Sequence, residues 1–166
     1  MMLRMSPEAK ERATPPDGGR TFVTQQQIRF GDVDPAGIVF YPRIYDFIHR
    51  AFEELWDVHV GERYYYLIRE KRVGFPLVHS EVDFVSPLYF GDRPIVRISC
   101  FKLGRTSLGL RYRYFVDERL CLEARMTTVS VRLDDLEKFE IDAHYRQKFE
   151  DILEPSAENA QPDDAS

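Results

Sequence analysis

Residues 42–55 read PRIYDFIHRAFEEL, and this stretch decides the fold. Its apolar residues recur at steps of three and four and predict one long amphipathic helix; they are Ile44, Phe47, Ile48, Ala51, Phe52 and Leu55. Pro42 suits the first turn of a helix, because a missing N–H leaves no hydrogen bond unmade there. A helix with a single apolar face needs a second layer to cover that face.

The segments around this helix predict that the second layer is an antiparallel sheet. A strand over 21–30 and a loop over 32–38 precede the helix, and a short helical turn over 62–71 follows it. The later pattern predicts strands over 77–85, 95–103, 110–116 and 121–133 and a last helix over 143–153. Along the strand 121–133, the alternation of apolar and polar residues shifts by one position between Met126 and Val129, which suggests a bulge. The order of elements indicates an α+β fold with a helix packed on one face of an antiparallel sheet.

Length and charge limit the classes of function. The chain has 166 residues, enough for one domain, which we place at 21–153 between a flexible leader (1–20) and an acidic flexible tail (154–166). The net charge is −5, without the basic surface of a nucleic-acid binder. Neither a membrane span nor a secretory signal is apparent. Cys100 and Cys121 lie in apolar segments, so we expect buried free thiols and a cytoplasmic protein.

One loop carries the chemistry. Residues 30–42, FGDVDPAGIVFYP, place carboxylates directly before the N-terminus of the long helix. Backbone N–H groups at a helix N-terminus suit a developing oxyanion, and Tyr41, Arg43 and Ile44 could donate them. A carboxylate beside such donors suits hydrolysis of an acyl bond. The alternative is that Asp32 and Asp34 only form the turn and interact with the helix dipole.

Residues 27–42, QIRFGDVDPAGIVFYP, resemble the active-site signature of the 4-hydroxybenzoyl-CoA thioesterase family, the Pseudomonas-type branch of hot-dog-fold thioesterases. A weaker resemblance extends over about 21–145. It implies a hot-dog fold, in which the sheet wraps the long helix. It also implies that Asp34 is the catalytic carboxylate, that the Tyr41 amide polarises the thioester carbonyl and that Asp32 is structural. Members of the family form dimers with active sites at the subunit interface, often paired into tetramers, so we expect a homodimer or homotetramer.

The resemblance also implies basic residues that hold the phosphates of coenzyme A. The matching turn contains Lys102 and Arg105, and Arg125 follows on a later strand. Lysine and arginine suit phosphate by charge and geometry. The family has a denser basic cluster here, and Gly104 and Thr106 depart from it. The three cations could equally be solvated strand residues.

These patterns together predict an acyl-CoA thioesterase that acts without a metal or another cofactor. We expect an aromatic acyl group such as 4-hydroxybenzoyl or benzoyl, because the resembled signature belongs to the aromatic branch of the family and because Phe40 and Tyr41 lie beside the site. Asp34 would act as nucleophile or as general base. The alternatives are a short- or medium-chain aliphatic acyl-CoA thioesterase and a non-catalytic acyl-CoA-binding protein. A hydratase is disfavoured, because such sites usually combine aspartate with histidine and this loop has no histidine. The four histidines have no metal-ligand spacing.

Overall fold

A computed structural model of the chain describes residues 20–155. The elements in chain order are β1 (Phe22–Gln25), a 3-10 turn η1 (Phe30–Asp32), α2 (Arg43–Glu54), a π-helical turn η2 (Leu55–Val60), α3 (Tyr64–Arg69), β2 (Val73–Gly74), β3 (Leu77–Phe84), β4 (Ile95–Leu103), β5 (Ser107–Val116), β6 (Arg119–Val129), β7 (Val131–Arg132) and α4 (Ala143–Glu150). The expected leader and tail lie outside the described residues, apart from Arg20, Glu154 and Pro155. Within residues 20–155, no helix is long and apolar enough to cross a bilayer.

The long helix forms where the apolar spacing predicted it. Pro42 occupies the N-cap position, and all six residues of the predicted apolar stripe are buried. The backbone then continues into η2, which ends at Gly61. Gly61 has a φ of 84°, a conformation that favours glycine, and its N–H donates to the Trp56 carbonyl (2.9 Å).

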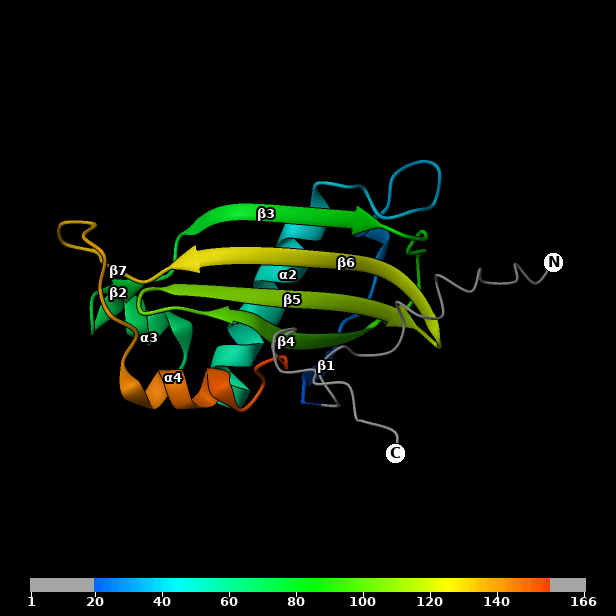
Figure 1. The fold of residues 1–166 in the computed structure, drawn as a ribbon. Helices are drawn as coiled ribbons and strands as arrows, with labels where there is room; N and C mark the ends of the chain where they lie inside the picture. The colour runs from blue at the N-terminus through cyan, green and yellow to red at the C-terminus, as the bar shows by residue number, and fades with distance from the viewer. Residues whose placement is uncertain (1–19, 156–166) are drawn as a thin grey trace, which may run out of the picture.

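The sheet has five antiparallel strands in the order β1-β4-β5-β6-β3. Helix α2 crosses one face of it, and α4 lies at the lower edge near β4 (Figure 1). The face toward α2 carries the buried side chains of alternating strand residues, including Ile98 on β4, Tyr112 on β5 and Ala124 on β6. The predicted α+β fold with a helix on an antiparallel sheet is confirmed.

The first strand is shorter than predicted. Strand β1 ends at Gln25, because the chain then leaves β4 and Ile28 donates its N–H to the Asp92 carbonyl (2.9 Å). Ile28 is fully buried, so its apolar side chain belongs to the core without being part of a strand. Phe30, the predicted end of the strand, begins η1 instead.

The predicted bulge between Met126 and Val129 is wrong. Pairing between β5 and β6 is regular there, because the buried Thr128 and Ser130 continue the inward alternation with polar side chains. The Thr128 hydroxyl donates to the Leu108 carbonyl (3.2 Å), which satisfies it within the core. The extra residue lies on the neighbouring strand instead, where Val78 of β3 has no partner in the register with β6.

A charged network holds the end of the described chain on the sheet. The Arg111 side chain donates to Glu154 (2.7 Å) and Glu123 (2.8 Å), and Glu123 also accepts from Arg113 (2.7 Å). Burial alone would raise the pKa of Glu123, but its two arginine partners lower that pKa below its ordinary value. Glu154, which the sequence assigned to the tail, is therefore bound to the sheet.

Both cysteines are buried free thiols, as the sequence predicted. Burial raises the pKa of Cys100 to about 12, and it also raises the pKa of Cys121. Both thiols therefore stay protonated at neutral pH, which makes them poor nucleophiles.

Candidate active site

The loop between η1 and α2 closes into a tight turn around Asp34. The Asp34 N–H donates to the Ile38 carbonyl (2.9 Å), and the Gly37 N–H donates to the Asp34 carbonyl (2.9 Å). Gly37 has a φ of 79°, which residues with a side chain rarely adopt. An isolated bridge between Val33 and Val39 fastens the base of this turn. Asp34 is thus the first residue of a tight turn, 34–37, in the loop that leads into the long helix.

The two aspartates of the loop have different surroundings. The Asp32 carboxylate accepts from the Arg29 N–H (2.8 Å), and the Asp32 carbonyl accepts from the Phe40 N–H (3.0 Å). Asp34 Oδ1 accepts from the Ala36 N–H (2.8 Å). Asp34 Oδ2 has no hydrogen-bond partner among the described residues. Asp32 therefore holds the loop together, whereas the partly buried Asp34 keeps one carboxylate oxygen for another partner.

Backbone N–H groups at the start of α2 are largely occupied. The Arg43 N–H donates to the Phe40 carbonyl (2.8 Å), and the Ile44 N–H donates to the Tyr41 carbonyl (3.1 Å). Pro42 has no N–H. Of the three donors considered from the sequence, the Tyr41 N–H alone has no acceptor within residues 20–155. One free N–H and one free carboxylate oxygen therefore belong to the same short loop.

An apolar cavity of about 340 Å³ adjoins this helix start. Tyr41 and Ile44 form one side, Phe84 and Leu88 another, and Cys121 belongs to the wall on β6. Phe40, expected from the sequence to bind substrate, is not in this lining. Its ring is 47% exposed and packs against the Tyr41 ring, with centroids 5.5 Å apart. The cavity offers an apolar group a place beside Tyr41, whereas Asp34, like Phe40, does not line it.

Two of the three predicted phosphate-binding cations lie near each other on the sheet. Arg125 places its guanidinium 4.7 Å from the centre of the Phe101 ring, and Arg111 lies 5.8 Å from the same ring. Lys102 pairs with Gly109, where an added Cβ would meet both the Phe101 ring (2.6 Å) and Lys102 Cβ (3.0 Å). Phe101 and Lys102 therefore both cover the bare backbone of Gly109. The sequence analysis did not single out Phe101, whose ring contacts these cations. Its position directly before Lys102 was the one sequence signal that it belongs to this group.

Arg105 does not join this group. It lies in the turn between β4 and β5, is strongly exposed, and its guanidinium is 3.8 Å from the Glu140 carboxylate. Arg125 is also paired, because it donates to Glu81 (3.2 Å), which in turn contacts His79 (3.2 Å). Contact with His79 and the charge of Arg125 lower the pKa of Glu81. No group of three histidine, cysteine or acidic side chains within residues 20–155 is arranged to hold a metal ion.

Comparison with known families decides the affiliation of the chain. The sequence pattern of the thioesterase-like superfamily matches residues 28–149, which contain the loop, α2 and the strands that follow. The chain belongs to the thioesterase-like superfamily. Among solved structures, this superfamily member resembles a gentisyl-coenzyme A thioesterase (TM-score 0.70, 29% identity) over 77% of its own length and 99% of that chain. A thioesterase-superfamily protein from Jannaschia sp. CCS1 matches 86% of it and 99% of that chain (TM-score 0.78, 25% identity).

Curated relatives of this thioesterase-like protein are named 1,4-dihydroxy-2-naphthoyl-CoA hydrolases. The protein from Rippkaea orientalis is 34% identical over 52% of this chain and 62% of its own length. The protein from Crocosphaera subtropica is 30% identical over 64% of this chain and 78% of its own length. The matches with the first three relatives span only 62–65% of those proteins. The expected relationship to hot-dog thioesterases is thus confirmed at the level of the superfamily, and the names of these relatives do not specify the 4-hydroxybenzoyl-CoA branch.

Proposed function

We propose that the protein is an acyl-CoA thioesterase that hydrolyses the thioester of an aromatic acyl-CoA to the free acid and coenzyme A. The observation that carries this proposal is that a free Asp34 oxygen and a free Tyr41 N–H belong to one loop, and that Tyr41 also lines an apolar cavity. The names of the relatives support the same reaction class. The free thiols support a reducing compartment, and we place the protein in the cytoplasm.

Each free group has a defined task in this proposal. The Tyr41 N–H donates to the thioester carbonyl oxygen and stabilises the negative charge that develops on it. The Asp34 carboxylate either attacks the carbonyl carbon or takes a proton from the attacking water. In the general-base route the carbon–sulfur bond breaks, the free acid forms directly, and the proton that Asp34 took from water passes to the leaving thiolate. In the nucleophilic route the thiolate leaves and takes a proton from solvent, and water then hydrolyses the mixed anhydride on Asp34, which releases the acid and restores the carboxylate. Both routes need the same ionised carboxylate, and neither uses a metal or cofactor.

An aromatic acyl group is our first choice of substrate. The cavity beside Tyr41 is lined by apolar side chains, among them Phe84 and Leu88, which suit a planar ring. The relatives' names include two aromatic acyl groups, naphthoyl and gentisyl. The alternative is a short- or medium-chain aliphatic acyl group. The choice is tested by comparing kcat/KM for three aromatic substrates, benzoyl-, 4-hydroxybenzoyl- and 1,4-dihydroxy-2-naphthoyl-CoA, with kcat/KM for butyryl- and octanoyl-CoA. We expect higher kcat/KM values for the aromatic substrates. Higher values for both aliphatic substrates would contradict an aromatic specificity.

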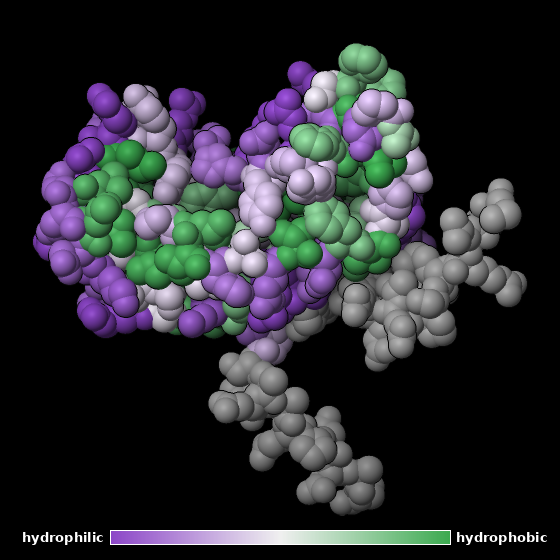
Figure 2. All heavy atoms as spheres, turned by 90° about the horizontal axis from the view of Figure 1, so that it is seen from above, coloured by the Kyte–Doolittle hydropathy of each residue, from purple (hydrophilic) through white to green (hydrophobic). Residues whose placement is uncertain are grey.

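We further propose a homodimer, or a dimer of dimers, built through strand β3. This strand pairs only with β6 among the described residues, so its other edge has unpaired backbone groups. Val78 and Phe84 on β3 are 59% and 62% exposed, and the view onto this side of the molecule shows clusters of apolar side chains (Figure 2). A second copy would cover this edge by symmetric pairing. The loop around Asp34 would then lie next to the subunit interface.

The coenzyme A phosphates are assigned to Lys102, Arg105 and Arg125, and Phe40 to the entrance of the acyl site. Lys102→Gln and Arg125→Gln are expected to raise KM several-fold and leave kcat nearly unchanged, because phosphates far from the reacting bond bind equally in ground and transition states. Arg105→Gln should have a smaller effect, since Glu140 already balances that charge.

Steady-state kinetics with an acyl-CoA and with the matching acyl-pantetheine separate a phosphate contact from a folding defect. The truncated substrate lacks the nucleotide, so its KM should not respond to either substitution. Equal losses with both substrates would contradict the assignment of the phosphates to this surface.

A further inference from the structure

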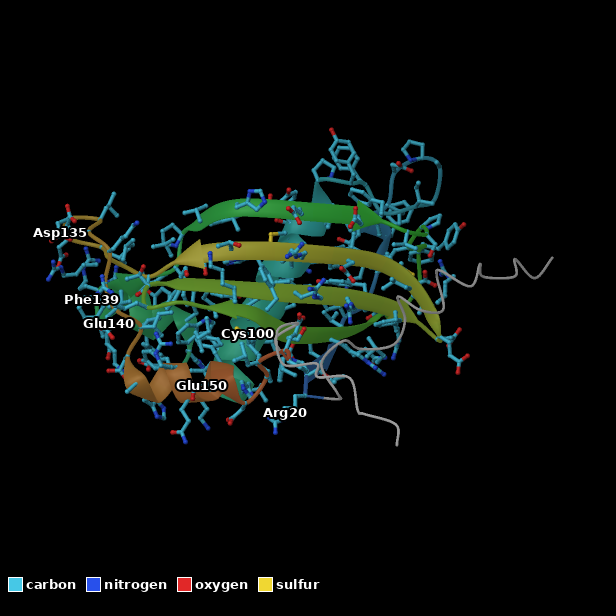
Figure 3. All side chains as sticks on the ribbon, viewed as in Figure 1. Arg20, Cys100, Asp135, Phe139, Glu140 and Glu150 are labelled. Carbon is cyan, nitrogen blue, oxygen red and sulfur yellow. The ribbon has the colours of Figure 1, made fainter. Side chains whose placement is uncertain are left out.

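A second cavity, of about 530 Å³, lies at the other end of the sheet. It is lined by residues of α3, β2, the start of α4 and the segment between β7 and α4. Figure 3 places Phe139 and Glu140 of that segment beside β2 and β7, whereas the loop around Asp34 lies at the opposite end of the sheet in Figure 1. No residue is shared between this lining and that of the cavity beside Tyr41.

Ser130 gives this cavity an unsatisfied polar group. Its side chain is fully buried, and its Oγ has no hydrogen-bond partner within residues 20–155. The Ser130 backbone is already occupied, because its N–H donates to the Thr106 carbonyl (2.7 Å) and its carbonyl accepts from the Phe139 N–H (2.9 Å). A buried hydroxyl without a partner is destabilising and uncommon in native proteins. An oxygen atom of a molecule in the cavity would satisfy it.

The charged groups that line the cavity already have polar partners, some of them outside the lining. Lys71 Nζ donates to the Glu62 carboxylate (2.9 Å) and to the Tyr145 hydroxyl (2.7 Å), and Tyr145 donates to Glu62. Glu140 faces Arg105 across 3.8 Å. The Asp142 carboxylate accepts from the His144 N–H (2.8 Å) and caps α4. A lysine ammonium has three donors, so Lys71 keeps one N–H for a ligand acceptor.

We propose that this cavity binds an uncharged aromatic molecule that carries a hydroxyl or carbonyl oxygen. Leu67, Phe75 and Ile141 line it with buried apolar surface, which favours a ring. The paired charges offer no compensation to an ionised ligand, so a neutral molecule is favoured. Ser130 Oγ and the spare Lys71 N–H supply the polar contacts that orient it. This cavity shares no lining residue with the acyl cavity beside Tyr41, and binding in it does not depend on the proposed reaction.

The test titrates the full-length protein with 2-naphthol while amide signals are followed by NMR. Naphthalene serves as the matched ring without oxygen, and 2-naphthoate as the charged counterpart. We expect 2-naphthol to shift the amide signals around Ser130 and Ile141 and to bind more tightly there than either control. Ser130→Ala should weaken this binding about fivefold, the loss of one hydrogen bond. Ser86→Ala, a serine of the cavity beside Tyr41, should leave it unchanged.

Three outcomes would overturn the proposal. The first is that 2-naphthol shifts only the amides around Tyr41 and Leu88. The second is equal affinity of 2-naphthol and naphthalene for the region around Ser130. The third is unchanged affinity in Ser130→Ala, which would mean that water alone satisfies the hydroxyl. Phe139→Ala provides a second variant, because Phe139 is 39% exposed and its ring can be removed without a core cavity.

Discussion

Replacing Asp34 by asparagine is expected to lower kcat by about a hundredfold or more, with little change in Tm. The amide oxygen of asparagine can still accept from the Ala36 N–H, so the turn keeps its geometry. The negative charge is lost, and an amide neither attacks a thioester carbon nor takes a proton from water. Release of coenzyme A, followed with a thiol reagent, measures kcat, and thermal unfolding measures Tm.

Asp32→Asn is the matched control within the same loop. Asp32 accepts from the Arg29 N–H and so stabilises the turn before the loop. Its substitution should lower Tm by a few degrees and leave kcat within a few-fold of the unmodified protein. Near-normal kcat in Asp34→Asn together with loss of activity in Asp32→Asn would show that the roles of the two aspartates are reversed.

The second large effect is expected at the free edge of the sheet. The double substitution Leu77→Lys with Val78→Lys places two cations on β3, away from the acyl cavity, where like charges would face each other in a symmetric pair of strands. The assembly should dissociate to monomers of 19.5 kDa in sedimentation velocity. The rate of hydrolysis should fall at least tenfold, because the partner subunit no longer supports the loop around Asp34. A tenfold fall in rate corresponds to about 1.4 kcal/mol of activation free energy.

A double substitution elsewhere controls for the added charge. Val58 on η2 and Leu136 in the segment after β7 are 64% and 69% exposed and lie outside β3. Val58→Lys with Leu136→Lys should leave both the assembly and the activity unchanged. A fully active monomer of the β3 variant would contradict a site at the interface, and a monomeric unmodified protein would contradict the dimer itself.

The sequence predicted the helix and the sheet because their signals are local. The apolar stripe from Ile44 to Leu55 has a helical period that any buried amphipathic helix must show, and strand 95–103 was predicted to the residue. The helical turn after Gly61 was predicted over 62–71, close to the observed α3. These segments need no information about distant residues.

Other features depend on contacts between residues far apart in the chain. Thr128 and Ser130 are polar side chains in inward positions, so the alternation was hidden and a bulge was wrongly inferred. The pairing of Arg105 with Glu140 joins residues 35 positions apart, and no local pattern indicates it. The Tyr41 N–H stands out only once the acceptors of the Arg43 and Ile44 N–H groups are known.

The most direct test of the account is the product formed when the purified protein meets a thioester substrate. Benzoyl-CoA and crotonyl-CoA are each incubated with it, and free thiol and enoyl absorbance are recorded together. The proposed mechanism predicts thiol release from benzoyl-CoA that disappears in Asp34→Asn, with no loss of the enoyl signal by hydration of crotonyl-CoA. Hydration without thiol release would indicate a hydratase. Tight binding of acyl-CoA with neither change would indicate a non-catalytic binder, and either result would contradict hydrolysis at Asp34.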